Sequence, residues 1–290
     1  MLVQVGNRLH IVFTEEGYTF GNCVLVDDDI RIMIDSGAGK ILEQTKPEQI
    51  DVLINTHHHY DHIRDNNCFT NARILLHPLE HPGMKSLEMI MALDGWDELM
   101  PRFFADLAPD TGWQDLTWTV DGEISDSQLI DCGTTKVMVI HTPGHSKGHC
   151  SFHFPEEDLT FVGDICLTKV GPWYGEPNTD LSAFMDSIDR IINLKPSRVV
   201  SSHVNEVIED PIQALREYGH RIILREQRII KHIKKNPSTI DQLAAKHLIY
   251  RVHQSPMILF WEKCMLKNHL ERLILLGQAE ELEDGVYGCL

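Results

Sequence analysis

Four potential metal ligands lie within six residues in the stretch Thr56-His57-His58-His59-Tyr60-Asp61-His62. This HxHxDH stretch follows an apolar run, Val52-Leu53-Ile54, that is typical of a buried strand. A histidine run alone is weak evidence for a metal site, because histidines also cap turns and form hydrogen bonds in protein cores. The residues further along the chain therefore have to support the interpretation.

Three later strand-like runs also end in a histidine or an aspartate next to a turn-forming residue. Thr142-Pro143-Gly144-His145 follows the run 137–140, Gly163-Asp164 follows the run 159–162, and Ser201-Ser202-His203 follows the run 198–200.

This ordered set resembles the metallo-β-lactamase fold superfamily of metal-dependent hydrolases. The resemblance implies an α+β fold, a four-layer αββα sandwich, with two metal ions at its active site. Imidazole and carboxylate ligands suit Zn²⁺, which is the expected metal, with iron or manganese as alternatives. By this resemblance, His57, His59 and His145 would hold one ion, Asp61, His62 and His203 would hold the other, and Asp164 would bridge the two.

The implied activity is a binuclear metal-dependent hydrolase. Two divalent ions about 3.5 to 4 Å apart can share a water and lower its pKa toward ~7, so that a bridging hydroxide attacks the substrate. The expected substrate is a small molecule with an ester, thioester or lactone group. Asp61 is the candidate to orient the hydroxide or to pass a proton to the leaving group.

Other segments have predicted supporting roles. Asp35 either supports the ligand loop or only caps a turn, and His58 should point away from the site. The Gly- and Pro-rich loop after Asp164 should border the pocket. Residues 84–107 predict a pair of core-packing helices or, alternatively, a lid over the metals. The substrate-contact candidates of the loop, which could instead be surface residues, are Lys169, Trp173 and Tyr174.

The end of the chain differs from the rest in charge. The net charge is -17 for the whole chain, -20 for residues 1–210 and +3 for residues 211–290. We therefore predict a catalytic domain over 1–210 and a mostly helical, winged-helix-like extension over 211–290. Helix-starting residues stand at Thr179-Asp180, Ser238-Thr239 and Ser255-Pro256, and residues 278–289 predict a small hairpin.

The extension carries a second resemblance. His220-Arg221 and Arg225-Glu226-Gln227 are similar to the HR…REQ stretch of metallo-β-lactamase-fold proteins with a winged-helix extension, a group related to β-lactamase-like protein 2. Some of that group are RNA nucleases. One helix face would carry Arg221, Arg225, Arg228, His232 and Lys235.

These features leave three alternative functions open. The same metals and the basic helix face fit a single-strand RNA endonuclease, although the net charge of -17 disfavours nucleic acid as a partner. A mono-iron persulfide-type dioxygenase would use a subset of the ligands. A regulatory metal-binding protein would use the winged helix for interaction. The basic face could otherwise be a solvated surface or the contact of a homodimer.

The compartment is predicted from cysteines and the N-terminus. Seven cysteines without a CxxC pair fit reduced thiols, and the first residues lack the features of a secretory signal. With no apolar stretch long enough for a bilayer, we expect a cytoplasmic protein without membrane association.

Overall fold

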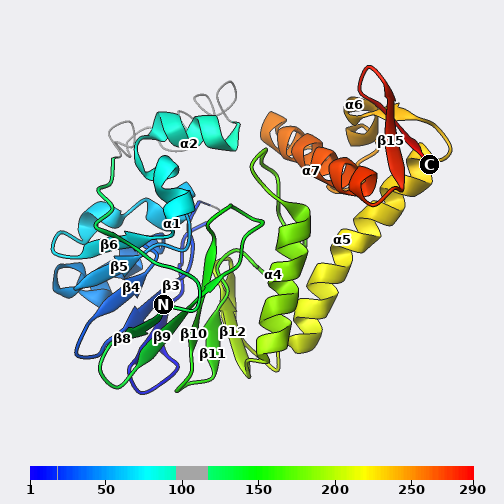
Figure 1. Ribbon diagram of the computed structural model, residues 1–290. Helices are drawn as coiled ribbons and strands as arrows, with labels where there is room; N and C mark the ends of the chain where they lie inside the picture. The colour runs from blue at the N-terminus through cyan, green and yellow to red at the C-terminus, as the bar shows by residue number, and fades with distance from the viewer. Residues whose placement is uncertain (18, 96–116) are drawn as a thin grey trace.

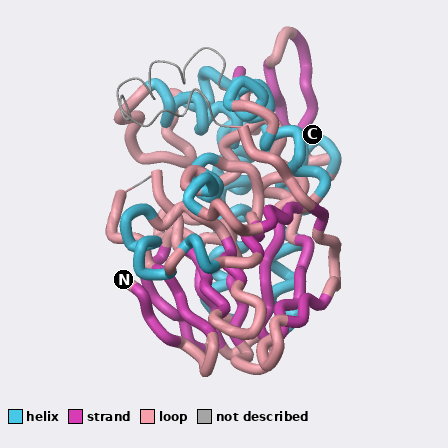
Figure 2. Tube along the Cα trace, turned by 90° about the vertical axis from the view of Figure 1, so that its left-hand side faces the viewer, coloured by secondary structure: helices cyan, strands magenta, loops and turns pink. Residues whose placement is uncertain are grey.

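Two β-sheets packed face to face form the centre of the protein, as the computed structural model in Figure 1 shows. The structure describes residues 1–17, 19–95 and 117–290. In Figure 2 the strands of both sheets gather at the bottom of the view, while the C-terminal hairpin stands apart at the top.

The first sheet has seven strands in chain order. Neighbours are antiparallel from β1 to β4 and parallel from β4 to β7. The first four strands therefore form an antiparallel meander. The strands are β1 (Leu2–Gln4), β2 (Leu9–Val12), β3 (Cys23–Val26), β4 (Ile32–Ile34), β5 (Val52–Ile54), β6 (Arg73–Leu76) and β7 (Gly122–Glu123).

The second sheet has six strands in the order β13-β12-β11-β10-β9-β8. Its pairs are antiparallel except for β11 with β12. The strands are β8 (Leu129–Asp131), β9 (Lys136–His141), β10 (Cys150–Phe154), β11 (Leu159–Phe161), β12 (Arg198–Ser201) and β13 (Val204–Glu209).

Apolar residues cover both faces of each sheet. Between the sheets, Ile34 and Ile54 of the first share a core with Phe152 and Phe161 of the second. Because successive residues of a strand point to opposite faces, Leu53 of β5 packs on the outer face. Both faces being buried explains why β5 is a continuous apolar run.

Helices form the two outer layers, so the predicted four-layer αββα sandwich is confirmed. The 3-10 helix Gly39–Thr45 covers the first sheet through Leu42, while α4 (Leu181–Leu194) and α5 (Ile212–Ile233) cover the second. The Asp180 side chain caps α4 at the predicted position. The remaining 3-10 helices are Pro47–Gln49, Asn66–Cys68 and Pro78–Met84; the short helix α1 spans Tyr60–Ile63, and α2 spans Leu87–Asp94.

The C-terminal extension has its own small core beside the sandwich (Figure 1). After α5 it contains β14 (Ser238–Thr239), α6 (Ile240–Ala244) and α7 (Pro256–Leu275), followed by the hairpin of β15 (Ala279–Glu283) and β16 (Val286–Cys289). Thr239 and Ser255 cap α6 and α7 as predicted, and the hairpin is confirmed. The winged-helix identity and the boundary at 210 stay predictions.

Three further observations bear on the sequence predictions. Within the predicted segment 84–107 the structure describes α2, whereas residues 96–107 lie outside the described residues. The choice between a helix pair and a lid therefore stays open. All seven cysteines are free thiols. None of the helices described is both long enough and apolar enough to cross a bilayer.

Candidate metal centre

Three imidazole nitrogens converge at the edge of the sandwich where β5 and β9 end. Nε2 of His145 lies 3.2 Å from Nε2 of His57 and 3.0 Å from Nδ1 of His59. Ligands about 2.0–2.1 Å from a tetrahedral zinc are separated by about 3.3 Å, so this spacing fits three ligands of one ion. The donor set is thus compatible with the first predicted site.

A second group lies beside the first. Oδ2 of Asp61 is 3.3 Å from Nε2 of His203 and 3.8 Å from Nε2 of His62. Asp164 lies between the groups, because its Oδ2 is 3.3 Å from Nε2 of His145 and 3.4 Å from Nε2 of His203. The structure thus brings together all seven predicted ligands, while their role as ligands stays a prediction.

The pKa shifts in this cluster favour a neutral imidazole at His145 and a positively charged one at His203. Burial lowers the pKa of His145 to about 4. Burial also opposes a charge on His203, but the carboxylates of Asp164 and Asp61 outweigh it and raise the pKa of His203 to about 10. A negative field of this kind stabilises bound cations as well as protonated histidine.

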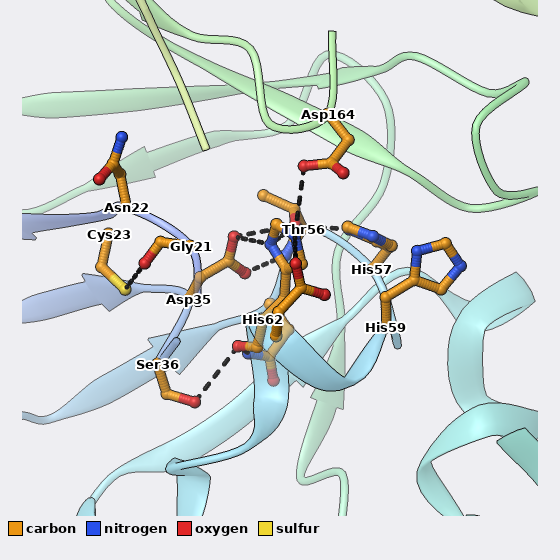
Figure 3. Close-up of polar contacts among 12 residues, drawn as sticks. Gly21, Asn22, Cys23, Asp35, Ser36, Thr56, His57, His59, His62 and Asp164 are labelled. Carbon is orange, nitrogen blue, oxygen red and sulfur yellow. Dashed lines mark hydrogen bonds and ion pairs between the residues drawn. The ribbon is translucent and has the colours of Figure 1, made fainter. Parts of the chain in front are cut away.

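Asp35 supports the ligand loop and does more than cap a turn. It accepts hydrogen bonds from the Thr56 backbone N–H at 2.7 Å, from the Thr56 hydroxyl at 2.9 Å and from Nδ1 of His62 at 2.8 Å (Figure 3). The contact to Nδ1 directs Nε2 of His62 toward Asp164. Nearby, a Cβ at Gly37 would lie 1.5 Å from the backbone oxygen of Asp61, so glycine is needed there.

His58 points away from the cluster, as predicted, into a buried acidic pocket. Its Nδ1 contacts Glu80, and its Nε2 lies 3.3 Å from Oδ1 of Asp94. Burial alone would lower the pKa of His58, but the two carboxylates raise it well above its usual value. The other oxygen of Glu80 accepts hydrogen bonds from the Ser146 hydroxyl at 2.8 Å and from the Gly148 backbone. Glu80 thereby joins the two loops that carry His57, His59 and His145.

Glu176, like Glu80, is a buried residue beside the cluster that was not predicted from the sequence. Its Oε2 lies 2.9 Å from Nε2 of His59, on the side of the ring opposite the atom that faces His145. Burial, followed by the charge of Asp94, raises the pKa of Glu176 well above its usual value. Neither Glu176 nor Glu80 belongs to a spacing motif; Glu176 approaches the site from a loop and Glu80 from the 3-10 helix Pro78–Met84, so no local signal could have identified them.

A cavity of about 530 Å³ opens in front of the cluster. Trp173 lines it, whereas neither Lys169 nor Tyr174 is among its lining residues. Tyr174 is fully buried, and its hydroxyl contacts Nε2 of His269 at 2.7 Å and the Arg225 guanidinium at 2.8 Å. Of the three substrate-contact candidates, the structure therefore brings Trp173 to the site.

The arginines of the predicted basic face of α5 make contacts within the protein, while Lys235 of that face is exposed. Arg225 is buried and donates hydrogen bonds to the carbonyls of Val170 and Pro172 and to Tyr174. Arg221 contacts the carbonyl of Lys169, and Arg228 donates to that of Leu248 at 3.3 Å. Arg221 and Arg225 thus hold the loop beside the cavity, which weakens the reason to expect RNA on this helix.

Replacing Arg225 by methionine tests this anchoring role. We expect the free energy of unfolding to fall by about 2 kcal/mol, because buried acceptors lose their charged donor. Urea denaturation measures the loss. Arg216→Met is the matched control, because Arg216 is exposed on the same helix, and its effect should stay within about 0.5 kcal/mol. Equal stability of the two variants would contradict the anchoring role.

Comparisons with known proteins agree on one family. The sequence model of the Metallo-beta-lactamase superfamily matches residues 17–203. A Beta-lactamase-like protein 2 homolog from Drosophila melanogaster is 28% identical over 255 residues, which are 84% of this chain and 78% of that protein. A Hydroxyacylglutathione hydrolase from Maricaulis maris is 31% identical over 115 residues, or 40% of this chain and 33% of that one.

A solved structure extends the likeness to the whole chain. The metallo-beta-lactamase family protein TTHA1429 from Thermus thermophilus superposes with a TM-score of 0.79 at 22% identity, covering 99% of this chain and 100% of the other. At this identity the match shows a shared fold, including the arrangement of sandwich and extension.

Proposed function

This chain belongs to the metallo-β-lactamase superfamily, and we propose from that membership and its site that it is a hydrolase using two divalent ions. Its substrate would be a small ester, thioester or lactone. The observation that carries the proposal is the position of Asp164, whose Oδ2 lies 3.3 Å from His145 and 3.4 Å from His203. One carboxylate between two groups of imidazoles is an arrangement that fits a pair of cations.

The chemistry follows from the donor set. Bound divalent ions supply Lewis acidity and lower the pKa of water toward about 7. Asp61 lines the cavity and faces His203, so it can accept a proton from the attacking water and return it to the leaving group. Oε2 of Glu176 lies 2.9 Å from Nε2 of His59, so Glu176 is the candidate to orient this ring. The ions would be held by His57, His59, His145, Asp61, His62, His203 and Asp164.

The cavity favours an ester, thioester or lactone of a carboxylic acid over a phosphodiester as the substrate. No lysine or arginine occurs among the described residues that line it. Proteins that bind RNA usually contact its phosphates through lysine and arginine, and Arg221 and Arg225 on the basic face of α5 are used to hold the loop beside the cavity. The relative named Hydroxyacylglutathione hydrolase, by its name, acts on a thioester. That chemistry is the one we propose here.

Metal removal tests the proposal directly. We expect about two metal ions per chain by elemental analysis, with zinc as the expected metal, and hydrolysis of at least one member of a panel of esters, thioesters and lactones. Dialysis against a chelator should abolish this hydrolysis, and adding Zn²⁺ should restore it. One iron per chain with oxygen consumption would instead indicate the dioxygenase. Cleavage of RNA without any of the panel would indicate the nuclease.

A further inference from the structure

The C-terminal extension supplies part of the cavity wall beside the metal centre. Ile258 and Trp261 line the cavity from α7, and Tyr250 lines it from the segment that precedes this helix. Residues three apart on a helix share one face, so Ile258 and Trp261 present one continuous surface. The extension is therefore part of the substrate cavity.

An aromatic path leads from the candidate ligands to this wall. The ring of Trp173 lies 5.4 Å from that of His145 and 6.1 Å from that of His59, measured between centroids. On its other side, the Trp173 ring meets Trp261 edge to face at 5.5 Å. A group attached to the reacting carbonyl would thus extend along Trp173 toward α7.

The charges of the lining define what this path can hold. The carboxylates at the cavity are Glu16, Asp61, Asp164 and Glu176, while no described lining residue is a lysine or arginine. A second anionic group on the substrate would lose its hydration without gaining a lysine or arginine partner among these residues. An apolar chain, by contrast, gains free energy from leaving water.

We propose that Ile258, Trp261 and Trp173 bind the apolar acyl chain of a neutral ester, thioester or lactone, so that the extension selects the substrate. This inference rests on the proposed hydrolase function and adds a substrate class to it. Burying one methylene corresponds to about a fourfold gain in kcat/KM. Activity should therefore rise with acyl length until the cavity is full.

The test uses the full-length, metal-loaded protein with p-nitrophenyl esters of two to ten acyl carbons. The measured quantity is the ratio of kcat/KM for the longest ester to that for the acetyl ester. We expect Ile258→Trp to lower this ratio at least tenfold, because the larger ring fills the path. Ile258→Ala should move the optimum to a longer chain. Circular dichroism checks that both variants are folded. If one of them is not folded, the other alone is enough to test the inference.

Leu259→Ala is the matched control, because Leu259 follows Ile258 on the same helix but packs against the core of the extension. Its ratio should match that of the wild type. Hydrolysis with a length profile that neither Ile258 variant changes would overturn the inference and leave the hydrolase function intact. If the wild type hydrolyses no ester, thioester or lactone, both the function and the inference are wrong.

Discussion

Replacing Asp164 by asparagine is expected to lower kcat/KM roughly 10³-fold, because metal-ion catalysis contributes several kcal/mol and each 1.4 kcal/mol is a factor of ten. Asp164 contacts imidazoles of both groups, so a neutral amide in its place weakens the attraction for both ions. Elemental analysis should show a fall from two metals per chain toward one. Steady-state kinetics on the best ester or thioester measure the rate.

The control for this change is Asp189→Asn, in which an exposed carboxylate on α4 is lost. It should keep the metal content and the rate of the wild type. An Asp164→Asn protein with two ions and full activity would remove the bridging role, and with it the main support for a binuclear centre.

Replacing Glu80 by alanine is expected to lower the free energy of unfolding by about 3–5 kcal/mol, because breaking a buried ion pair leaves one charge uncompensated. Glu80 contacts the ring of His58, whose pKa is raised, and it also accepts hydrogen bonds from the Ser146 hydroxyl and the Gly148 backbone N–H. The two loops that carry His57, His59 and His145 lose their common partner. Metal affinity should therefore also fall, by roughly 10–100-fold, as for other groups that orient ligands.

Urea denaturation of the metal-free protein measures the stability, and competition with a chromophoric chelator measures the affinity. Glu88→Ala serves as the control, because Glu88 is exposed in the first turn of α2. Loss of stability without loss of metal affinity would show that Glu80 supports the fold but does not position the ligand loops.

The sequence predicted the cluster of candidate ligands because its members come in short groups, each of which begins shortly after a strand-like run. His57, His145 and Asp164 sit in short connections behind β5, β9 and β11, where local patterns are strong. The helix starts at Asp180, Thr239 and Ser255 could also be predicted from the sequence, because a capping side chain acts within its own turn. Local chemistry of this kind can be inferred from one sequence.

The missed features depend on contacts between distant segments. Glu80 approaches the site from the short 3-10 helix Pro78–Met84 and Glu176 from a loop, and no periodicity predicts the path of either segment. The basic pattern on α5 was correct, but Arg225 donates to carbonyls more than 50 residues earlier in the chain, so its surroundings could not be inferred from the helix alone. The same limit applies to Tyr174, which the sequence placed at the pocket and the structure places in the core.

The packing of α5 constrains how proteins of this fold could diversify or be recombined. Leu215 and Tyr218 of α5 and Met265 of α7 share one hydrophobic cluster with Phe184 and Val199 of the sandwich. A chain cut at residue 210 would expose that cluster to water and open one side of the cavity. A chimaera made to acquire a new substrate range should therefore exchange the α7 residues that line the cavity and retain the α5 residues of this cluster.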